Sequence, residues 1–79
     1  MNHFERLRDI REDHDLTQTD VARLLGTTRQ QGSKWETGGQ MMGVDKYIIL
    51  AKHYNISTDY LLGLIDTPIK LYLLNKKSE

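Results

Sequence analysis

Apolar residues recur along this chain every three or four positions, the spacing of helices that bury one face. The clearest stripes are Phe4, Leu7 and Ile10 near the start, and Tyr47, Leu50, Ala51 and Tyr54 further on. From these stripes and the capping residues around them we predict five helices, over about residues 2–12, 18–25, 29–37, 44–54 and 57–62. No convincing strand pattern occurs in the body, so the expected fold class is all-α.

Residues 16–38, LTQTDVARLLGTTRQQGSKWETG, hold two of these helices with a glycine turn between them. Thr17 and Asp20 have the spacing of a capping box at the start of the first helix. Thr28 and Gln31 have the same spacing at the start of the second helix, and glycine follows the end of each helix. Two capped helices joined by so tight a turn are the sequence form of a helix-turn-helix, whose second helix enters the DNA major groove.

A helical projection at about 100° per residue divides the second of these helices into two faces. One face carries Gly32, Trp35 and Glu36, with Trp35 as the inward apolar anchor. The opposite face is polar and consists of Gln30, Ser33, Lys34 and Thr37. Such a face is most often simply solvated, but glutamine can pair with adenine, and lysine or arginine with guanine. Arg29 lies between the two faces at the helix start.

Length and composition leave room for one small domain. The chain has 79 residues and no cysteine, so disulfides and cysteine-based zinc sites are excluded. No apolar run approaches the roughly 18 residues that cross a bilayer, and the N-terminus is too charged for a signal peptide. We therefore expect a cytoplasmic protein without a membrane partner. Because 11 basic residues balance 11 acidic ones, any affinity for DNA must come from local placement of charge.

No arrangement of catalytic or metal-binding residues stands out. The three histidines are scattered, and the polar patch of residues 13–15 is typical of a solvated turn before a helix cap. Ser33 and Ser57 have structural explanations, so no hydrolase triad is indicated. No glycine-rich phosphate loop follows a strand. We expect no enzyme activity, no metal and no cofactor.

Residues 4–63 resemble the Cro/repressor-type helix-turn-helix family, also called the xenobiotic-response-element family of transcriptional regulators. The pieces that carry the resemblance are IREDHDLTQTDVARLLGTTRQQGSKWETG and LAKHYNISTDYLLG. The resemblance implies a compact five-helix, lambda-repressor-like DNA-binding domain over residues 1–66, followed by a short apolar C-terminal tail over residues 67–79. It also implies a sequence-specific transcriptional regulator, a repressor that binds a palindromic operator in double-stranded DNA as a homodimer.

Individual residues acquire roles from the same resemblance. Gln18 stands where the family places a glutamine that bonds a phosphate, and Arg29 where members contact bases or phosphates. Arg11 and Glu36 fall on the positions of a structural salt bridge between the first and third helices. Threonines at both ends of the third helix can also reach phosphates. The expected DNA-binding set is Gln18, Thr28, Arg29, Gln30, Ser33, Lys34 and Thr37.

Three residues depart from the family pattern. Gly32 replaces a bulky side chain that other members pack into the core. This predicts a close approach of another element, a mobile recognition helix, or a gap that Met41 or Met42 fills. Gly39 replaces a common basic residue and Met42 a common proline, so the loop after the third helix loses charge and stiffness.

The tail after Pro68, IKLYLLNKKSE, is too apolar for an ordinary disordered end. If it is extended, Ile69, Leu71 and Leu73 share one face. The tail either closes the core of its own domain or assists a two-fold dimer together with Ile49, which projects away from its helix's core stripe. We favour the dimer, because paired recognition helices need such a contact.

A competing function is that of a protein-binding helix-turn-helix module, such as an antitoxin or an anti-repressor partner. Zero net charge and the apolar tail favour this reading, and it would give the chain a regulatory protein partner. The polar face of the third helix favours DNA instead.

Overall fold

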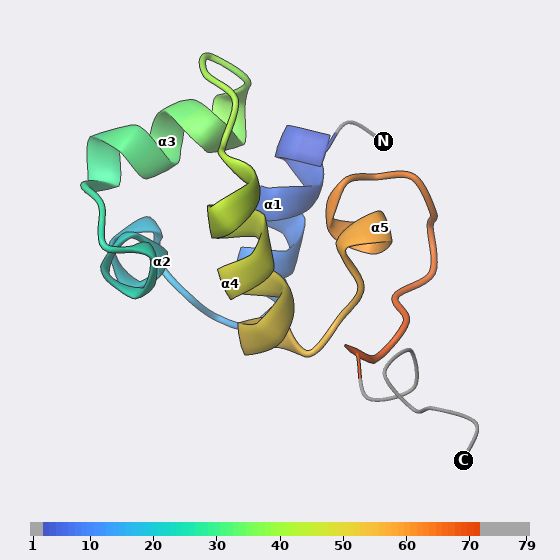
Figure 1. Cartoon of the computed structure of the whole chain (residues 1–79). Coiled ribbons are helices and arrows are strands. Elements are labelled where there is room, and N and C mark those ends of the chain that lie inside the picture. The colour runs from blue at the N-terminus through green and yellow to red at the C-terminus, as the bar shows by residue number, and fades with distance from the viewer. Residues whose placement is uncertain (1–2, 72–79) are drawn as a thin grey trace.

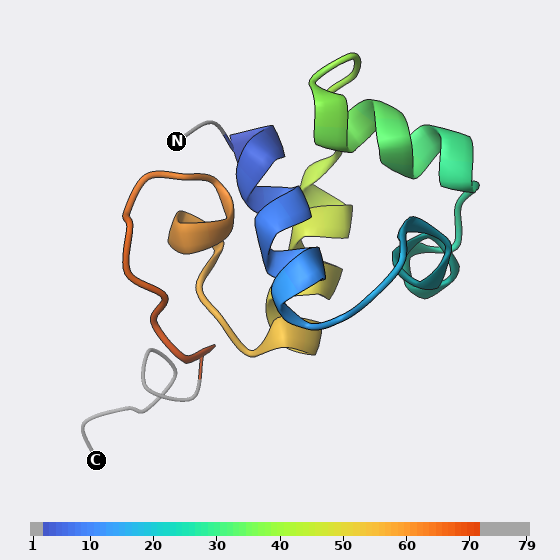
Figure 2. The ribbon, with the colours of Figure 1, turned by 180° about the vertical axis from the view of Figure 1, so that it is seen from behind.

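A computed structural model describes residues 3–71, which form five helices joined by short loops (Figure 1). The helices are α1 (His3–Asp13), α2 (Gln18–Leu25), α3 (Arg29–Thr37), α4 (Val44–Tyr54) and α5 (Thr58–Leu61). Figure 2 shows the same arrangement from behind, with α2 and α3 on one side of α1 and α4, and α5 on the other. The predicted all-α, lambda-repressor-like fold class is confirmed. The fifth helix is shorter than predicted, because Leu62 is its C-terminal cap.

Both helices of the helix-turn-helix begin at a threonine cap. The Thr17 hydroxyl accepts from the Asp20 N–H at 3.0 Å, and the Asp20 carboxylate accepts from the Thr17 N–H at 2.9 Å, which lowers the pKa of that carboxyl. Thr28 accepts from the Gln31 N–H at 3.1 Å. The second half of the other predicted box is wrong, because the Gln31 amide donates to Gln40 Oε1 at 2.7 Å instead. The loop after α3 places this acceptor within reach of the side chain.

The turn between α2 and α3 depends on a left-handed glycine. Gly26 has φ +69°, a conformation that side chains with a Cβ rarely adopt, and its N–H closes the last turn of α2. Lys46 of α4 also caps this end, since its ammonium donates to the Leu25 carbonyl at 3.0 Å. The turn is therefore held both locally and from α4.

The core is a single cluster of apolar side chains from four of the helices and two loops. Its buried members are Leu7, Ile10, Val21, Leu25, Met42, Tyr47, Leu50, Ala51, Tyr54, Ile56 and Leu61. No residue of α3 is fully buried, and Trp35 packs against the cluster half-buried. Apolar contact alone therefore attaches α3 weakly, and polar contacts must help to hold it.

The described part of the tail lies on its own domain. Residues 69–71 run antiparallel to residues 55–57, with one backbone hydrogen bond of 2.8 Å and one of 3.2 Å. Leu71 packs half-buried against the core, and Ile69 is also half-buried. Up to this point the tail closes its own domain, which is the alternative that we did not favour from the sequence. Leu73 lies outside the described residues.

Arg6 holds the segment after α5 against α1. Its side chain is almost fully buried, and Nη1 donates to the carbonyls of Tyr60 at 2.8 Å and Ile65 at 3.1 Å. The guanidinium also lies 4.0 Å from the centre of the Tyr60 ring. Arg6 thus links α1 both to α5 and to the segment that follows it.

Candidate nucleic-acid interface

The third helix lies at the outside of the molecule (Figure 1), and the side chains of its polar face are mostly exposed. Arg29, Gln30, Lys34 and Thr37 are exposed, and Ser33 is half-buried. The Thr37 hydroxyl donates back to the Ser33 carbonyl at 3.0 Å. Within residues 3–71, the side chains of Arg29, Gln30 and Lys34 have no protein hydrogen-bond partner. These three side chains are therefore available to a ligand.

The single acidic residue of α3 is turned inward and neutralised. Arg11 Nε donates to Glu36 Oε2 at 2.7 Å, and Nη2 donates to Glu36 Oε1 at 3.1 Å. The two side chains are only 10% and 8% exposed, and the hydrogen bond to Glu36 is the main reason that the pKa of Arg11 is raised. The exposed charges of α3 are consequently both positive, which suits a surface facing phosphates.

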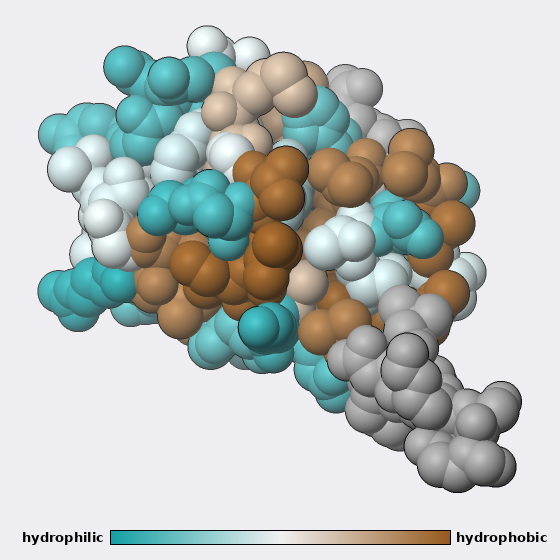
Figure 3. All heavy atoms as spheres, viewed as in Figure 1, coloured by the Kyte–Doolittle hydropathy of each residue, from teal (hydrophilic) through white to brown (hydrophobic). Residues whose placement is uncertain are grey.

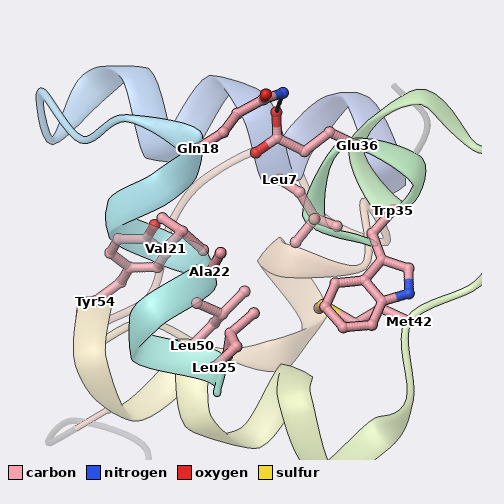
Figure 4. Close-up of a pocket in the computed structure, with 11 residues that line it drawn as sticks. Leu7, Gln18, Val21, Ala22, Leu25, Trp35, Glu36, Met42, Leu50 and Tyr54 are labelled. Carbon is pink, nitrogen blue, oxygen red and sulfur yellow. Dashed lines mark hydrogen bonds between the residues drawn. The ribbon is translucent and has the colours of Figure 1, made fainter. Parts of the chain in front are cut away.

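The same ion pair connects α1, α2 and α3. Arg11 Nη1 donates to the Leu16 carbonyl at 2.8 Å, in the loop before α2. Gln18 Nε2 donates to Glu36 Oε1 at 3.2 Å, as Figure 4 shows. Tyr54 lies beside this network, and burial with the nearby Glu36 charge raises its pKa to about 12. Gln18 thus braces α3 through Glu36, whereas its contact with a phosphate stays a prediction.

A cavity of about 20 Å³, room for one water-sized molecule, lies beneath α3 at Gly32. Trp35 and Met42 border it together with apolar residues of α2 and α4 (Figure 4). A Cβ built at Gly32 meets no heavy atom within 4 Å, so the predicted close approach of another element is wrong. Of the two methionines, Met42 is buried beside the gap and Met41 is 76% exposed. Met42 therefore borders the gap without filling it, and space for a side chain stays open next to Gly32.

Gly32→Ala should raise the free energy of unfolding by about 0.4–1 kcal/mol, because alanine restricts the unfolded chain and fits the helix. Gly26→Ala is the matched control. Its added Cβ also meets nothing within 4 Å, but its φ of +69° strains any side chain. That variant should be less stable than the parent. Urea unfolding followed by circular dichroism measures both, and a destabilised Gly32→Ala would show that α3 cannot accept a side chain there.

The loop after α3 carries a polar residue that sequence reasoning overlooked. Residues 38–43 contain no charge, and Gln40 is their one side chain with hydrogen-bonding groups other than sulfur. Its side-chain carbonyl accepts from Gln31 Nε2 at 2.7 Å, and the residue as a whole is exposed. The only feature of the sequence that could have indicated Gln40 is that it stands alone as a polar residue among glycines and methionines.

The residues predicted for a dimer interface occupy different environments. Ile49 is 36% exposed on α4, whereas Ile69 and Leu71 contact their own domain.

No three histidine, aspartate or glutamate side chains of residues 3–71 are grouped so that they could hold a metal ion. None of the described helices is long and apolar enough to cross a membrane.

Comparison with known sequences gives a consistent set of relatives. A family model described as helix-turn-helix matches residues 7–61. An uncharacterised HTH-type transcriptional regulator of Bacillus subtilis, YobD, is 38% identical over 64 residues, which are 81% of this chain and 57% of that protein. The antitoxin PezA of Streptococcus pneumoniae is 29% identical over 77 residues, which are 95% of this chain and 49% of that protein. The chain thus spans about half the length of these relatives.

Solved structures show the same arrangement of helices. A transcriptional regulator from Listeria innocua superposes with a TM-score of 0.78 at 25% identity, over 99% of this chain and 79% of that one. The P22 c2 repressor, solved in complex with a synthetic operator, superposes with a TM-score of 0.71 at 26% identity. That match covers 78% of this chain and 94% of the repressor chain.

Proposed function

The chain belongs to the helix-turn-helix family of the Cro/C1 type, a family of transcriptional regulators, and from that premise we propose that it is a sequence-specific DNA-binding repressor. It binds a palindromic operator as a homodimer and places α3 in the major groove. The observation that supports this most directly is the outer face of α3. Two cations and a glutamine are exposed there, and the one acid of the helix is buried in an ion pair.

The expected DNA-binding residues, which lie on α3, at its N-terminal cap and at the start of α2, divide into two groups by position and chemistry. Arg29, Gln30, Ser33 and Lys34 are proposed to contact base edges, because arginine and lysine pair with guanine and glutamine with adenine. Gln18, Thr28 and Thr37 are proposed to contact phosphates. Gln18 and Thr28 stand at helix N-termini, where backbone N–H groups attract anions.

The distribution of charge over the molecule explains how a chain of zero net charge can bind DNA. Acidic residues are concentrated on α1 and in the turn after it, whereas the only charged side chains that α3 exposes are Arg29 and Lys34. Counterion release depends on the cations that meet phosphates and not on the charge of the whole molecule. We therefore expect binding that weakens steeply with salt, although the chain is neutral as a whole. A regulator of this class works in the cytoplasm without a cofactor, and we expect no enzyme activity.

In vitro selection on random double-stranded DNA tests the proposal. The expected result is enrichment of a palindromic site with two half-sites about one helical turn apart. Recovery of a single unrepeated half-site would overturn the homodimer. Failure to enrich any sequence, with a folded chain at low salt, would overturn the proposal of sequence-specific DNA binding.

A second candidate is a protein-binding module with a regulatory protein partner, such as an antitoxin or an anti-repressor target. The observation that favours it is the exposed apolar surface near α4 and α5, where Met41, Val44 and Leu64 are each more than 70% exposed. The relative named an antitoxin agrees with this candidate. A failed DNA selection would leave it as the better reading.

A further inference from the structure

The recognition helix α3 has little apolar support along its length. None of its residues is fully buried, and Trp35 packs half-buried against the core. In the middle of the helix, Gly32 borders the open cavity and contributes no side chain to fill it. Figure 3 shows mainly hydrophilic side chains over α3, whereas hydrophobic side chains gather over α4 and α5. The direction of α3 therefore depends on what holds its two ends.

The two ends of α3 are held in different ways. At the C-terminal end, the Glu36 carboxylate accepts hydrogen bonds from Arg11 of α1 and Gln18 of α2. At the N-terminal end, the turn is closed by backbone bonds to α2, such as the one from the Thr27 N–H to the Ala22 carbonyl at 2.9 Å. Bonds of this local kind determine the shape of the turn. They do not attach the turn to the rest of the domain.

A lysine of α4 makes that attachment. Lys46 Nζ donates to the carbonyl of Leu25, the last residue of α2, at 3.0 Å. Among residues 3–71 this is the only hydrogen bond that joins α4 to the helix-turn-helix. A cation is favourable there, because the last carbonyl groups of a helix lack partners within it. The ion pair of Lys46 with Asp45 is long, at 3.8 Å, and Asp45 is 76% exposed, so the carbonyl is the stronger partner.

We propose that Lys46 is a positioning residue for DNA recognition, which sets the angle at which the N-terminal half of α3 enters the major groove. The inference rests on the proposed function and adds to it a residue that acts through the turn. Residues 26–28 lead directly into Arg29 and Gln30, the first of the proposed base contacts. A binding site has to hold its side chains within roughly 0.5 Å of the productive geometry. A looser turn therefore weakens these base contacts first.

The surroundings of Lys46 favour this role over a direct contact with a phosphate. Its side chain is 27% exposed, and its ammonium is bonded to the protein. Arg29 and Lys34 on α3 are exposed and have no protein hydrogen-bond partner within residues 3–71. The cations that are available to phosphates thus lie on α3, and the ammonium of Lys46 is committed to the turn.

Hydrogen exchange of the full chain without DNA tests the attachment through Lys46→Met, which removes the ammonium and keeps a long side chain. The N–H groups of Gly26 and Thr27, which bond to carbonyls of α2, should exchange at least about tenfold faster. The Gly39 N–H, bonded to the Lys34 carbonyl at the other end of α3, should keep its rate. Unchanged exchange at Gly26 and Thr27 would overturn the inference. Equal acceleration at Gly39 would indicate general destabilisation and would overturn it too.

Binding to the selected operator tests the positioning role. Lys46→Met should lower the ratio of operator affinity to nonspecific affinity by about tenfold, with preference lost mainly at the base pairs that Arg29 and Gln30 contact. The dependence of affinity on salt should stay that of the parent, because no phosphate contact is lost. Lys46→Arg keeps a donor for the carbonyl and should restore the preference. Lys52→Met, at an exposed lysine of the same helix, is the matched control and should bind like the parent.

Three results with DNA would contradict this role. A salt slope that falls by about 1 in Lys46→Met would identify a direct phosphate contact. Equal losses for operator and nonspecific DNA would show that Lys46 does not influence base recognition. A parent that selects no sequence would refute the proposed function and this role with it, even where exchange shows that Lys46 holds the turn. Normal exchange in a variant of a DNA-binding parent would refute the role of Lys46 alone.

Discussion

Arg11→Met should lower the free energy of unfolding by about 3–5 kcal/mol, because it leaves a buried carboxylate without its partner. The variant leaves the Glu36 carboxylate 8% exposed with its partner removed, and it also removes the hydrogen bond to the Leu16 carbonyl. Small domains are stable by only about 0.05–0.15 kcal/mol per residue. A 79-residue chain is therefore stable by about 4–12 kcal/mol, of which this variant should lose a large part.

Arg8→Met is the control for this experiment. Arg8 pairs with Glu12 at 3.1 Å on the same helix, but both side chains are more than half exposed. Exposed pairs of this spacing contribute only about 0.3–0.5 kcal/mol. Urea unfolding of Arg11→Met, Glu36→Gln and the double variant completes the test. The double variant should lose less free energy of unfolding than the two single variants together, because neither charge then stays buried alone. An Arg11→Met variant that is as stable as Arg8→Met would contradict this expectation.

The second large effect concerns DNA. Replacing Gln30, Ser33 or Lys34 with alanine should weaken binding to the selected operator by about 1–3 kcal/mol, roughly 5- to 150-fold, for each base contact removed. Preference should relax at the base pair that each side chain contacts. Gln18→Ala should instead weaken all sequences alike, as expected of a phosphate contact. Fluorescence anisotropy at fixed salt measures the affinities, and a repeated selection measures the preferences.

Lys52→Ala is the matched control for lost charge. Lys52 is exposed in the last turn of α4. Within residues 3–71 it makes no hydrogen bond to α3. Its loss should leave operator binding within about twofold of the parent, at a fixed salt concentration. If all four interface variants bind like the parent, the assignment of α3 is wrong. If Lys52→Ala loses as much as Lys34→Ala, binding depends on overall charge and not on the face of α3.

Much of the fold could be predicted because its signals are local. The structure has α2, α3 and α4 at the residues predicted from the sequence. A threonine cap and a left-handed glycine act within one turn of the chain, so Thr17 and Gly26 specify their helix ends without help from elsewhere. The division of α3 into an inward face with Trp35 and an outward polar face follows from helical periodicity in the same way.

Other features depend on segments that are distant along the chain. Gln31 was expected to complete a local cap, but Gln40 comes close enough in space to take its amide. Similarly, residues 69–71 were expected to be available to a partner, and they pair with the chain's own residues 55–57. In both cases the structure shows a contact with a segment that is distant along the chain, which a local pattern does not contain.

The sequence by itself determined the helices, the helix-turn-helix and its polar face, because short-range hydrogen bonds and helical periodicity specify them. Only the tertiary structure decided that the gap at Gly32 stays open and is bordered by Met42, where residues 69–71 lie, and that Met41, Val44 and Leu64 border one groove. These outcomes depend on which surfaces meet after the helices pack, and long-range packing selects among contacts that the local pattern allows equally.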